Sequence, residues 1–294
     1  MTKVAVVVLN WNGWSDTLAC VESLGRQTRP ADWVVLVDNA STDDSVARLR
    51  AACSENVVLL ESGGNWGFAG GNNVGVRWAL TQGADAVWLL NNDAIAAPGA
   101  LEALVKTDET RLDAGLIGTR IYEAARPDVL QCWGGGWINL WAGRAREYDY
   151  PVSEGALDYI SGCSLYMTRR GIERSGLLDE GFFMYFEDAE LSLRYRAQGW
   201  ALAVAHEAIV HHKGGASSRP GRRQSGWRTQ SLLRVLKLHS RSYLVSAALS
   251  TALRATSMAA RQDWEQLRAL AEDVRNNLQT PDWRQPCERS PRSA

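Results

Sequence analysis

The stretch VAVVVLNWNG, residues 4–13, is the clearest indication of fold class in the sequence. Its first six residues are apolar and mostly β-branched, which is typical of a strand buried on both faces, as in a parallel sheet. Asn12-Gly13 then breaks the run. Apolar runs of the same kind return at residues 33–37 (WVVLV), 57–60 (VVLL) and 86–90 (AVWLL). The four runs therefore predict four buried strands of one sheet.

Segments with the apolar spacing of helices separate these runs, at about residues 16–24, 45–52 and 73–82, and Pro98 suits the first turn of a fourth helix. This alternation over the first 105 residues predicts an α/β fold, with a mostly parallel central sheet flanked by helices. In such sheets ligands bind beyond the carboxyl ends of the strands. Polar residues cluster at those ends, at Asn10 and Asn12, Asp38 and Asn39, Asn65 to Asn73, and Asn91 to Asp93.

The chain follows a different pattern from about residue 120 onward. Gly134-Gly135-Gly136 lies among aromatic residues, which favours a loop or hairpin. Residues 159–168 read as a strand bent at Gly162, and residues 201–205 read as a short strand. The acidic cluster that begins at residue 187 opens a helix that runs to about residue 198, where Gly199 suits its end.

The last part of the chain differs in charge. Between Lys213 and Gln262 it holds no Asp or Glu but many Lys and Arg. Apolar residues there stand at helical spacing, which predicts a basic amphipathic appendage of one or two helices over residues 219–275. Residues 219–261 suit an anionic membrane surface, although a core-packing helix pair or a homodimer interface also fits the pattern. Residues 276–294 are polar and rich in proline, so we expect a disordered tail.

The composition argues against several classes of protein. A net charge of −1 over 294 residues argues against a nucleic-acid binder. The first residues lack the apolar segment of a secretory signal, and no apolar run is long enough to predict a membrane span. Five scattered cysteines without a CxxC pair suggest reduced thiols and a cytoplasmic protein. The GxGxxG fingerprint and the P-loop are both missing, which counts against a dehydrogenase and an NTPase.

Two aspartates at predicted strand ends are candidates for ligand binding. Asp93 follows Asn91-Asn92, and a carboxylate beside amide side chains suits Mg²⁺ or Mn²⁺, which take oxygen ligands. The alternative is that Asp93 only caps the following turn. Asp38 either accepts hydrogen bonds from a nucleoside or forms an Asx-turn before a helix capped by Asp43 or Ser45.

The loop from Gly63 to Asn73 holds five glycines and leads into a helix, so its backbone is suited to close approach by an anionic ligand. A plain surface loop is the alternative. Glu187 and Asp188 follow five residues, four of them aromatic, and a carboxylate against an apolar wall can act as a general base. Acidic residues also favour the first turn of any helix, so a structural role stays open.

The histidines near residue 210 do not form a zinc-protease motif. His206 and His211 are five residues apart and cannot share a helix face as HExxH requires. One histidine of the pair His211-His212 would complete a metal site with Asp93, or it would serve as a structural imidazole.

Six of these stretches, in this order, resemble the motifs of family 2 glycosyltransferases of the GT-A fold, within them the rhamnosyltransferase-like and galactofuranosyltransferase-like group. The stretches are VVVLNWN (6–12), VDNASTD (37–43), NWGFAGGNN (65–73), LLNND (89–93), FEDAEL (186–191) and HKGG (212–215). The resemblance covers about residues 3–218. It implies one GT-A domain over residues 1–218, with a nucleotide-sugar-binding half at 1–105 and an acceptor and catalytic half at 106–218.

The resemblance also implies roles for individual residues. Asp93 would bind Mg²⁺ or Mn²⁺ at the last carboxylate of the family's DXD motif, in which Asn91 replaces the usual first Asp. His212, rather than His211, matches the family's third metal contact, and Glu187 or Asp188 would be the catalytic base. Asp38 would hold the uridine or thymidine. The full set of residues that would bind the nucleotide-sugar is Asn10, Asn12, Asp38, Asn39, Asn65, Gly71, Asn72 and Asn92.

The implied reaction transfers a sugar with inversion at its anomeric carbon, as in the synthesis of cell-surface polysaccharides. TDP-rhamnose is the favoured donor and a UDP-sugar the alternative. The acceptor would be a glycan or a polyprenyl-diphosphate-linked sugar, which suits a protein on the inner face of the membrane. A non-catalytic nucleotide-sugar- or glycan-binding protein is another alternative. A nucleotidyltransferase is disfavoured, because residues 10–13 lack the basic signature of that class.

Overall fold

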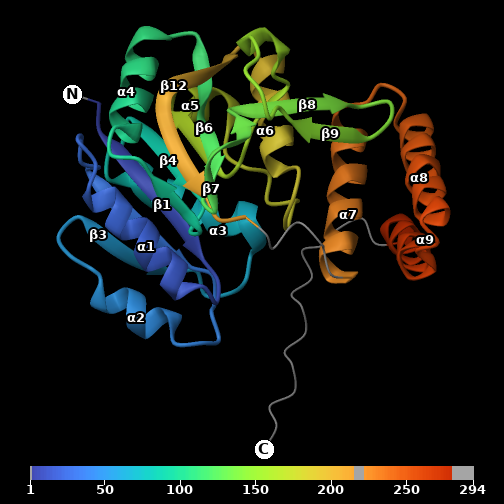
Figure 1. Cartoon of the computed structure of the whole chain (residues 1–294), viewed down its shortest axis with the longest axis horizontal. Helices are drawn as coiled ribbons and strands as arrows, with labels where there is room; N and C mark the ends of the chain where they lie inside the picture. The colour runs from blue at the N-terminus through green and yellow to red at the C-terminus, as the bar shows by residue number, and fades with distance from the viewer. Residues whose placement is uncertain (1, 215–221, 280–294) are drawn as a thin grey trace, which may run out of the picture.

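A nine-stranded sheet forms the centre of the molecule in the computed structural model, which describes residues 2–214 and 222–279 (Figure 1). Its strands are β1 (Val4–Asn10), β2 (Trp33–Asp38), β3 (Val57–Glu61), β4 (Ala86–Leu90), β5 (Ala94–Ala96), β6 (Ala114–Glu123), β7 (Arg126–Trp133), β11 (Ser164–Thr168) and β12 (Ala201–His212). They lie in the order β3-β2-β1-β4-β11-β6-β12-β5, and β7 pairs with β6.

Six of the nine strands run in the same direction, as the sequence predicts, while the eight strand pairings divide equally into four parallel and four antiparallel ones. Strands β1, β2, β3 and β4 pair in parallel, and β12 pairs in parallel with β6. Strand β11 runs antiparallel to both β4 and β6, so these two point the same way. The carboxyl ends of β1, β2, β4 and β12 therefore meet at one edge of the sheet, where Asn10, Asp38, Asp93 and His212 stand.

Helices cover both faces of this sheet. They are α1 (Trp14–Gly25), α2 (Ser45–Ala51), α3 (Gly67–Thr81), α4 (Ala100–Thr110), α5 (Arg169–Ser175) and α6 (Glu187–Ala197). Val4, Val6 and Val8 of β1 pack with residues of α1, α2 and α4, whereas Ala5 and Val7 pack with residues of α3, α5 and α6. This alternation along one strand produces the two helical layers, because successive side chains point to opposite faces. The predicted α/β fold is confirmed.

Helix α3 begins at Gly67, six residues earlier than the prediction near residue 73. The Asn65 side chain accepts a hydrogen bond from the Gly67 N–H at 3.0 Å and so satisfies a donor at the start of the helix. Glycine disfavours helix interiors, but a Cβ on Gly71 would lie 2.5 Å from Leu9 and one on Gly75 would lie 2.6 Å from Val7. The glycines therefore let α3 pack closely on β1 as a helix.

The predicted strand at 159–168 divides at its bend. Its first part is β10 (Tyr159–Ile160), which joins β8 (Gly135–Asn139) and β9 (Arg144–Glu147) in a second, three-stranded sheet, while β11 stays in the main sheet. The expected hairpin after Gly134 is thus formed by β8 and β9. A short 3-10 helix, η1 (Glu154–Ala156), precedes β10. The expected short strand at 201–205 is the first part of the longer β12, whose pairing with β6 is irregular between Ala205 and Ile209.

The basic appendage contains α7 (Arg222–His239), α8 (Tyr243–Ala260) and a third helix, α9 (Trp264–Gln279). Val235 of α7 packs with Phe182 and Ala189, so α7 rests against the start of α6. The β8–β9 hairpin reaches across to α8 (Figure 1). Residues 276–279 of the predicted tail belong to α9, and residues 280–294 lie outside the described residues. Within the described ranges, no helix is long and apolar enough to cross a membrane.

Candidate active site

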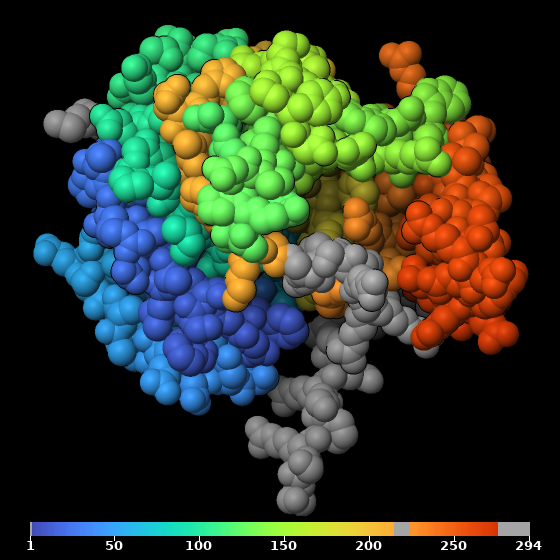
Figure 2. Space-filling model, in the orientation of Figure 1, coloured from blue at the N-terminus to red at the C-terminus, as the bar shows by residue number. Residues whose placement is uncertain are grey.

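A cavity of about 1200 Å³ opens at the carboxyl edge of the sheet. The surface is hollowed between the sheet and the C-terminal helices (Figure 2). The cavity is lined by residues at the ends of β4 and β12, by the loop before α6, and by Gln224, Trp227 and Arg228 of α7. Its volume exceeds the roughly 300–1,000 Å³ of an ordinary small-molecule pocket, so it offers space for two ligands at once.

Asp38 lies at the end of β2 with a side chain that is 1% exposed. Its carboxylate accepts hydrogen bonds from the Asn10 side chain at 2.9 Å, and from the hydroxyl and backbone N–H of Ser41 at 2.6 and 2.9 Å. Asn12 accepts a hydrogen bond from the Thr42 N–H at 2.7 Å. The side chains of Asn10, Asn12 and Asp38 therefore form hydrogen bonds within and between the turns that follow β1 and β2. They do not line the cavity, whereas the neighbouring Asn39 does.

Asn39 links the β2 end to the glycine-rich segment. Its amide donates to the side-chain oxygen of Asn65 and to the Gly67 carbonyl, both at 3.0 Å, and its oxygen accepts from the Trp66 N–H at 3.1 Å. Asn39, Asn65 and Asn72 line the cavity, and so does Asn92, which donates to Thr17 at 3.1 Å. Gly71 packs against Leu9 and Asn39 and does not line it. The structure therefore brings four of the eight predicted nucleotide-sugar contacts to the cavity wall.

Asp93, which follows β4, and His212, at the end of β12, lie side by side in the wall of the cavity. His212 Nε2 lies 3.2 Å from Asp93 Oδ1, and the two side chains are 13% and 25% exposed. Burial raises the pKa of Asp93, but the hydrogen bond and charge of His212, together with the charge of Lys213, outweigh burial and hold that pKa below its usual value. The carboxylate is therefore ionised at neutral pH.

Gln131 of β7 fixes the His212 ring from the other side. Its side-chain oxygen and nitrogen lie 3.2 and 3.1 Å from His212 Nδ1. The oxygen accepts when Nδ1 carries the proton, which leaves Nε2 free to bind a cation, and the nitrogen donates when Nε2 carries the proton and bonds Asp93. His211 turns away and packs on Tyr122, with ring centroids 6.0 Å apart. Of the two adjacent histidines, only His212 lines the cavity.

The donor set of Asp93 and His212 fits Mn²⁺ or Mg²⁺. His212 Nε2 and Asp93 Oδ1 lie close enough together to bind the same ion. Gln131 holds the imidazole by a hydrogen bond, as residues around a metal site often do for its ligands. Across residues 2–214 and 222–279, no three residues of the His, Cys, Asp and Glu types cluster as a complete metal cage. These ions commonly keep several waters and need only one or two protein ligands, so a two-residue donor set suits them.

Glu187 and Asp188 open α6 and face the cavity. Burial raises the pKa of Glu187, and the charge of Asp188 raises it further. Burial also raises the pKa of Asp188, although backbone N–H groups of Gly162 and Ala189, each 2.8 Å away, stabilise its ionised form. Glu187 is 6% exposed and its Oε2 has no hydrogen-bond partner. Asp188 is thus the more readily ionised of the two carboxyls.

The backbone before Glu187 is held in an unusual conformation. Tyr185 and Phe186 have φ angles of 72° and 64°, which non-glycine residues rarely adopt and which persist only when surrounding contacts fix them. Ser231 donates to the Met184 carbonyl at 2.8 Å, and the Phe183 carbonyl accepts from the Phe68 N–H at 2.6 Å. Helices α7 and α3 thereby fix the loop that presents the two carboxylates.

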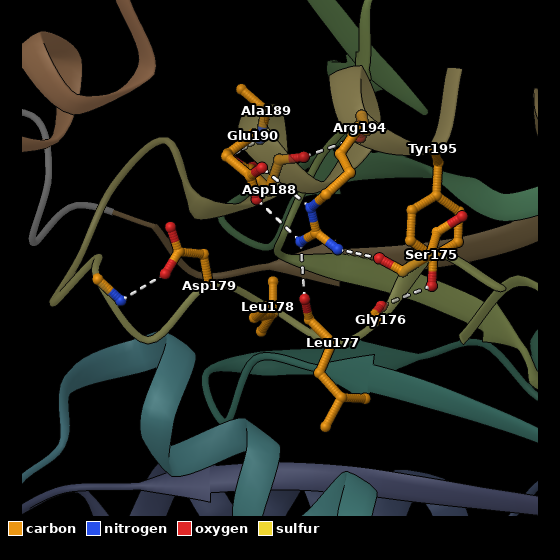
Figure 3. Close-up of polar contacts among 12 residues, drawn as sticks. Ser175, Gly176, Leu177, Leu178, Asp179, Asp188, Ala189, Glu190, Arg194 and Tyr195 are labelled. Atoms are coloured by element: carbon orange, nitrogen blue, oxygen red, sulfur yellow. Dashed lines mark hydrogen bonds and ion pairs between the residues drawn. The ribbon is translucent and has the colours of Figure 1, made fainter. Parts of the chain in front are cut away.

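Arg194 holds α6 against the segment that follows α5 (Figure 3). It forms two bonds to Glu190, at 3.0 and 2.9 Å, and donates to the carbonyls of Ser175 and Leu177. Tyr195 adds a hydrogen bond to the Gly176 carbonyl at 3.0 Å. The segment after α5 is therefore clamped to α6.

Several cavity residues escape sequence reasoning. Gln131 comes from β7 and Glu147 from β9, far along the chain from the residues they accompany. Glu147 accepts a hydrogen bond from Ser161 at 2.6 Å, and its charge helps to raise the pKa of Asp188. Neither residue belongs to a motif or to an expected strand end. Their position in the cavity becomes visible only once the pairing of β7 and β9 with other strands is known.

The family is established by comparison with known proteins. The sequence model described as "Glycosyl transferase family 2" matches residues 5–168, which is more than half of the chain. The protein therefore belongs to glycosyl transferase family 2.

Relatives within the family are modestly similar. The N-acetylglucosaminyl-diphospho-decaprenol L-rhamnosyltransferase of Mycobacterium tuberculosis is 29% identical over 223 residues, which cover 67% of this chain and 72% of that protein. The low-salt glycan biosynthesis hexosyltransferase Agl10 of Haloferax volcanii is 25% identical over 67% of this chain and 63% of its own. Galactofuranosyltransferase GlfT1 of M. tuberculosis is 39% identical over 95 residues, 32% of this chain and 31% of its own.

Two solved structures share the fold. One is GalNAc-T7 with UDP, GalNAc and Mn²⁺, with a TM-score of 0.67 and 15% identity over 95% of this chain. This chain spans 57% of the length of that protein. The other is the mannosyltransferase PcManGT of Pyrobaculum calidifontis with GDP-Man and Mn²⁺, with a TM-score of 0.59 and 18% identity over 94% of this chain and 87% of its own. The fold is GT-A.

Proposed function

We propose that this protein transfers a sugar, with rhamnose from TDP-rhamnose favoured, from a nucleoside-diphosphate donor to a lipid-linked or glycan acceptor, with inversion. The observation that carries the proposal is that one cavity holds both the Asp93–His212 pair and the Glu187–Asp188 pair. A cation site for a leaving diphosphate and a carboxylate for an incoming hydroxyl are the two functions that displacement at an anomeric carbon needs.

Asp93 Oδ1 and His212 Nε2 would hold Mn²⁺ or Mg²⁺, with Gln131 orienting the imidazole. When bound, such an ion offsets the negative charge that develops on a leaving nucleoside diphosphate. Asn39, Asn65 and Asn72 lie on the neighbouring wall and would bind the nucleoside end, while the Asp38–Asn10–Ser41 network keeps that wall rigid.

Asp188 would act as the general base. Its ionised form is stabilised by two backbone N–H groups, yet burial keeps its pKa raised, so it is both charged and basic near neutral pH. It would take the proton of the acceptor hydroxyl as that oxygen attacks the anomeric carbon. Glu187, which is more deeply buried and whose Oε2 has no hydrogen-bond partner, would stay protonated and preserve the low-polarity surroundings that raise the pKa of Asp188.

The acceptor class rests on a relative. One relative is named as acting on N-acetylglucosaminyl-diphospho-decaprenol, a polyprenyl-diphosphate-linked sugar. We extend that class to this chain, and with it a position at the inner face of the membrane, which the basic helix α7 favours.

The test is release of nucleoside diphosphate from a panel of donors. Purified protein is incubated with TDP-rhamnose, UDP-galactofuranose, UDP-glucose and GDP-mannose, each with Mn²⁺ or with EDTA, and the freed diphosphate is separated by ion-exchange chromatography. The proposal expects release in Mn²⁺, greatest from TDP-rhamnose, and none in EDTA. Tight donor binding without release, even with a polyprenyl-diphosphate-linked acceptor present, would instead indicate a nucleotide-sugar-binding protein.

A further inference from the structure

A second cavity, of about 430 Å³, lies beside the first, between the β8–β9 hairpin and helices α7 and α8. Four arginines line it: Arg144 and Arg146 from β9, Arg228 from α7 and Arg254 from α8. Trp137 of β8 and Phe186 complete the aromatic part of its wall. Four arginines from three separate elements therefore line one small space, which we call the arginine pocket.

Few carboxylates neutralise this charge. Arg146 pairs with Asp149 at 3.1 Å, and both side chains are more than half exposed. Among residues 2–214 and 222–279, Arg144, Arg228 and Arg254 form no ion pair with a carboxylate, and Arg228 lies over the Tyr185 ring at 5.6 Å. An excess of like charge held together by the fold is the arrangement that an anionic ligand stabilises.

Arg254 is the most buried of the four arginines. Burial lowers its pKa, and the positive charge of Arg228 lowers it further, whereas Asp273 acts in the opposite direction. A guanidinium that is partly removed from water and set beside a second one gains most from an anion that forms hydrogen bonds with both.

The arginine pocket opens toward the proposed catalytic groups. Arg146, Phe186 and Arg228 line both cavities, and Phe186 directly precedes Glu187. A ligand whose anionic group sits among the arginines would therefore extend a neutral group toward Asp188. The nucleotide-facing asparagines and Asp93 line only the larger cavity, so the two anion sites are separate.

Apolar residues are exposed near the same helices. Leu244, Val245 and Leu249, in the first two turns of α8, are 76%, 58% and 42% exposed. Trp141, in the β8–β9 turn, is 60% exposed, and Gly143 of that turn packs against Ser250 of α8. An arginine pocket with exposed apolar side chains nearby matches an amphiphile that carries a phosphate group and a hydrocarbon chain.

We propose that the arginine pocket binds the diphosphate group of an amphiphilic, isoprenoid-type acceptor and so directs the acceptor sugar toward Asp188. The name acceptor rests on the proposed function, but the binding of a diphosphate does not. The pocket would recognise the diphosphate through hydrogen-bonding guanidinium groups, while the exposed face of α8 would contact the hydrocarbon chain.

The first test is calorimetric titration of the full chain with inorganic pyrophosphate in EDTA, so that no metal can hold pyrophosphate at Asp93. We expect one site, and affinity that falls at least about tenfold in Arg254→Gln and in Arg144→Gln, since a charge-assisted hydrogen bond is lost. Arg241→Gln removes an exposed arginine that lines neither cavity, so this variant should bind pyrophosphate as the wild type does. Unchanged affinity in both arginine-pocket variants, with folded circular-dichroism spectra, would overturn the proposal.

The second test separates the sources of a phosphate group. Geranyl diphosphate and dihexanoyl phosphatidylglycerol each compete with pyrophosphate for the wild-type chain. The proposal expects displacement by geranyl diphosphate alone, and equal displacement by the phospholipid would overturn the assignment to a diphosphate. Metal-dependent donor hydrolysis by the wild type is measured in parallel. Pyrophosphate binding without hydrolysis would uphold the pocket and count against the transferase, and hydrolysis without pyrophosphate binding would do the reverse.

Discussion

Replacing Glu187 with glutamine should stabilise the protein by an amount that grows as pH rises. The Glu187 side chain is 6% exposed, its Oε2 has no hydrogen-bond partner, and burial and the charge of Asp188 raise its pKa. The unfolded chain releases this proton at a pKa of about 4.3, whereas the folded protein keeps it to higher pH. Above that pH the folded state binds more protons than the unfolded state, so the free energy of unfolding falls as pH rises.

The size of the effect follows from one proton. The free energy of unfolding should fall by up to about 1.4 kcal/mol for each pH unit over which Glu187 alone stays protonated in the folded state. Glutamine does not ionise, so the Glu187→Gln variant lacks this contribution. Urea denaturation at pH 5.5, 6.5 and 7.5 should show the variant's stability rising relative to wild type by about 1 kcal/mol or more per unit.

A matched control isolates the cause. Glu55 is an exposed glutamate before β3, and water solvates it in both the folded and the unfolded states. The Glu55→Gln variant should therefore follow the wild-type pH dependence. Parallel stability curves for wild type and Glu187→Gln across the three pH values would refute the reasoning that burial holds a proton on Glu187.

Three further outcomes follow from contacts in the site. Gln131→Ala should weaken Mn²⁺ binding about 10- to 100-fold, measured from the spin-resonance signal of free Mn²⁺, because His212 loses its orienting partner; unchanged affinity would contradict that role. Asp188→Asn should lower kcat about 10²- to 10⁴-fold while donor affinity persists, and a loss confined to donor affinity would remove Asp188 as the base. Gly67→Ala should lower the free energy of unfolding by more than about 1 kcal/mol, measured in urea, because φ is +68° and a Cβ would clash with the Phe183 carbonyl; an undiminished free energy would contradict the clash.

The fold could be predicted because its buried strands are visible in the sequence as apolar runs. Val4 to Leu9 and the three runs like it are apolar throughout, and the polar residues after them mark the ligand-binding edge. Periodicity fails where close packing decides the structure. Glycine suggested a loop before residue 73, yet Gly71 and Gly75 are helical because α3 must approach Leu9 and Val7.

The site was predictable at the strand ends and unpredictable elsewhere. Asp93 and His212 meet because β4 and β12 end at one edge. The strand-end position predicted Asp93, and the family motif distinguished His212 from His211. Gln131 joins them only because β7 folds back on β6, a pairing that no local pattern encodes. The arginine pocket likewise depends on α7 and α8 docking beside a hairpin from the middle of the chain. Asp38 illustrates the opposite limit. A local turn such as the one with Ser41 was among the alternatives that the sequence offered, but nothing there indicated that Asn10 of the neighbouring strand also bonds the Asp38 carboxylate.

Release of TDP from TDP-rhamnose in Mn²⁺, with a polyprenyl-diphosphate-linked sugar present, can be compared among wild type, Asp93→Ala, Asp188→Asn and the control Glu55→Gln. We expect release by wild type and by the control, and a loss of at least about 100-fold in both active-site variants. Full activity in Asp93→Ala, with its dependence on Mn²⁺ intact, would rule out Asp93 as the metal ligand of a transferase.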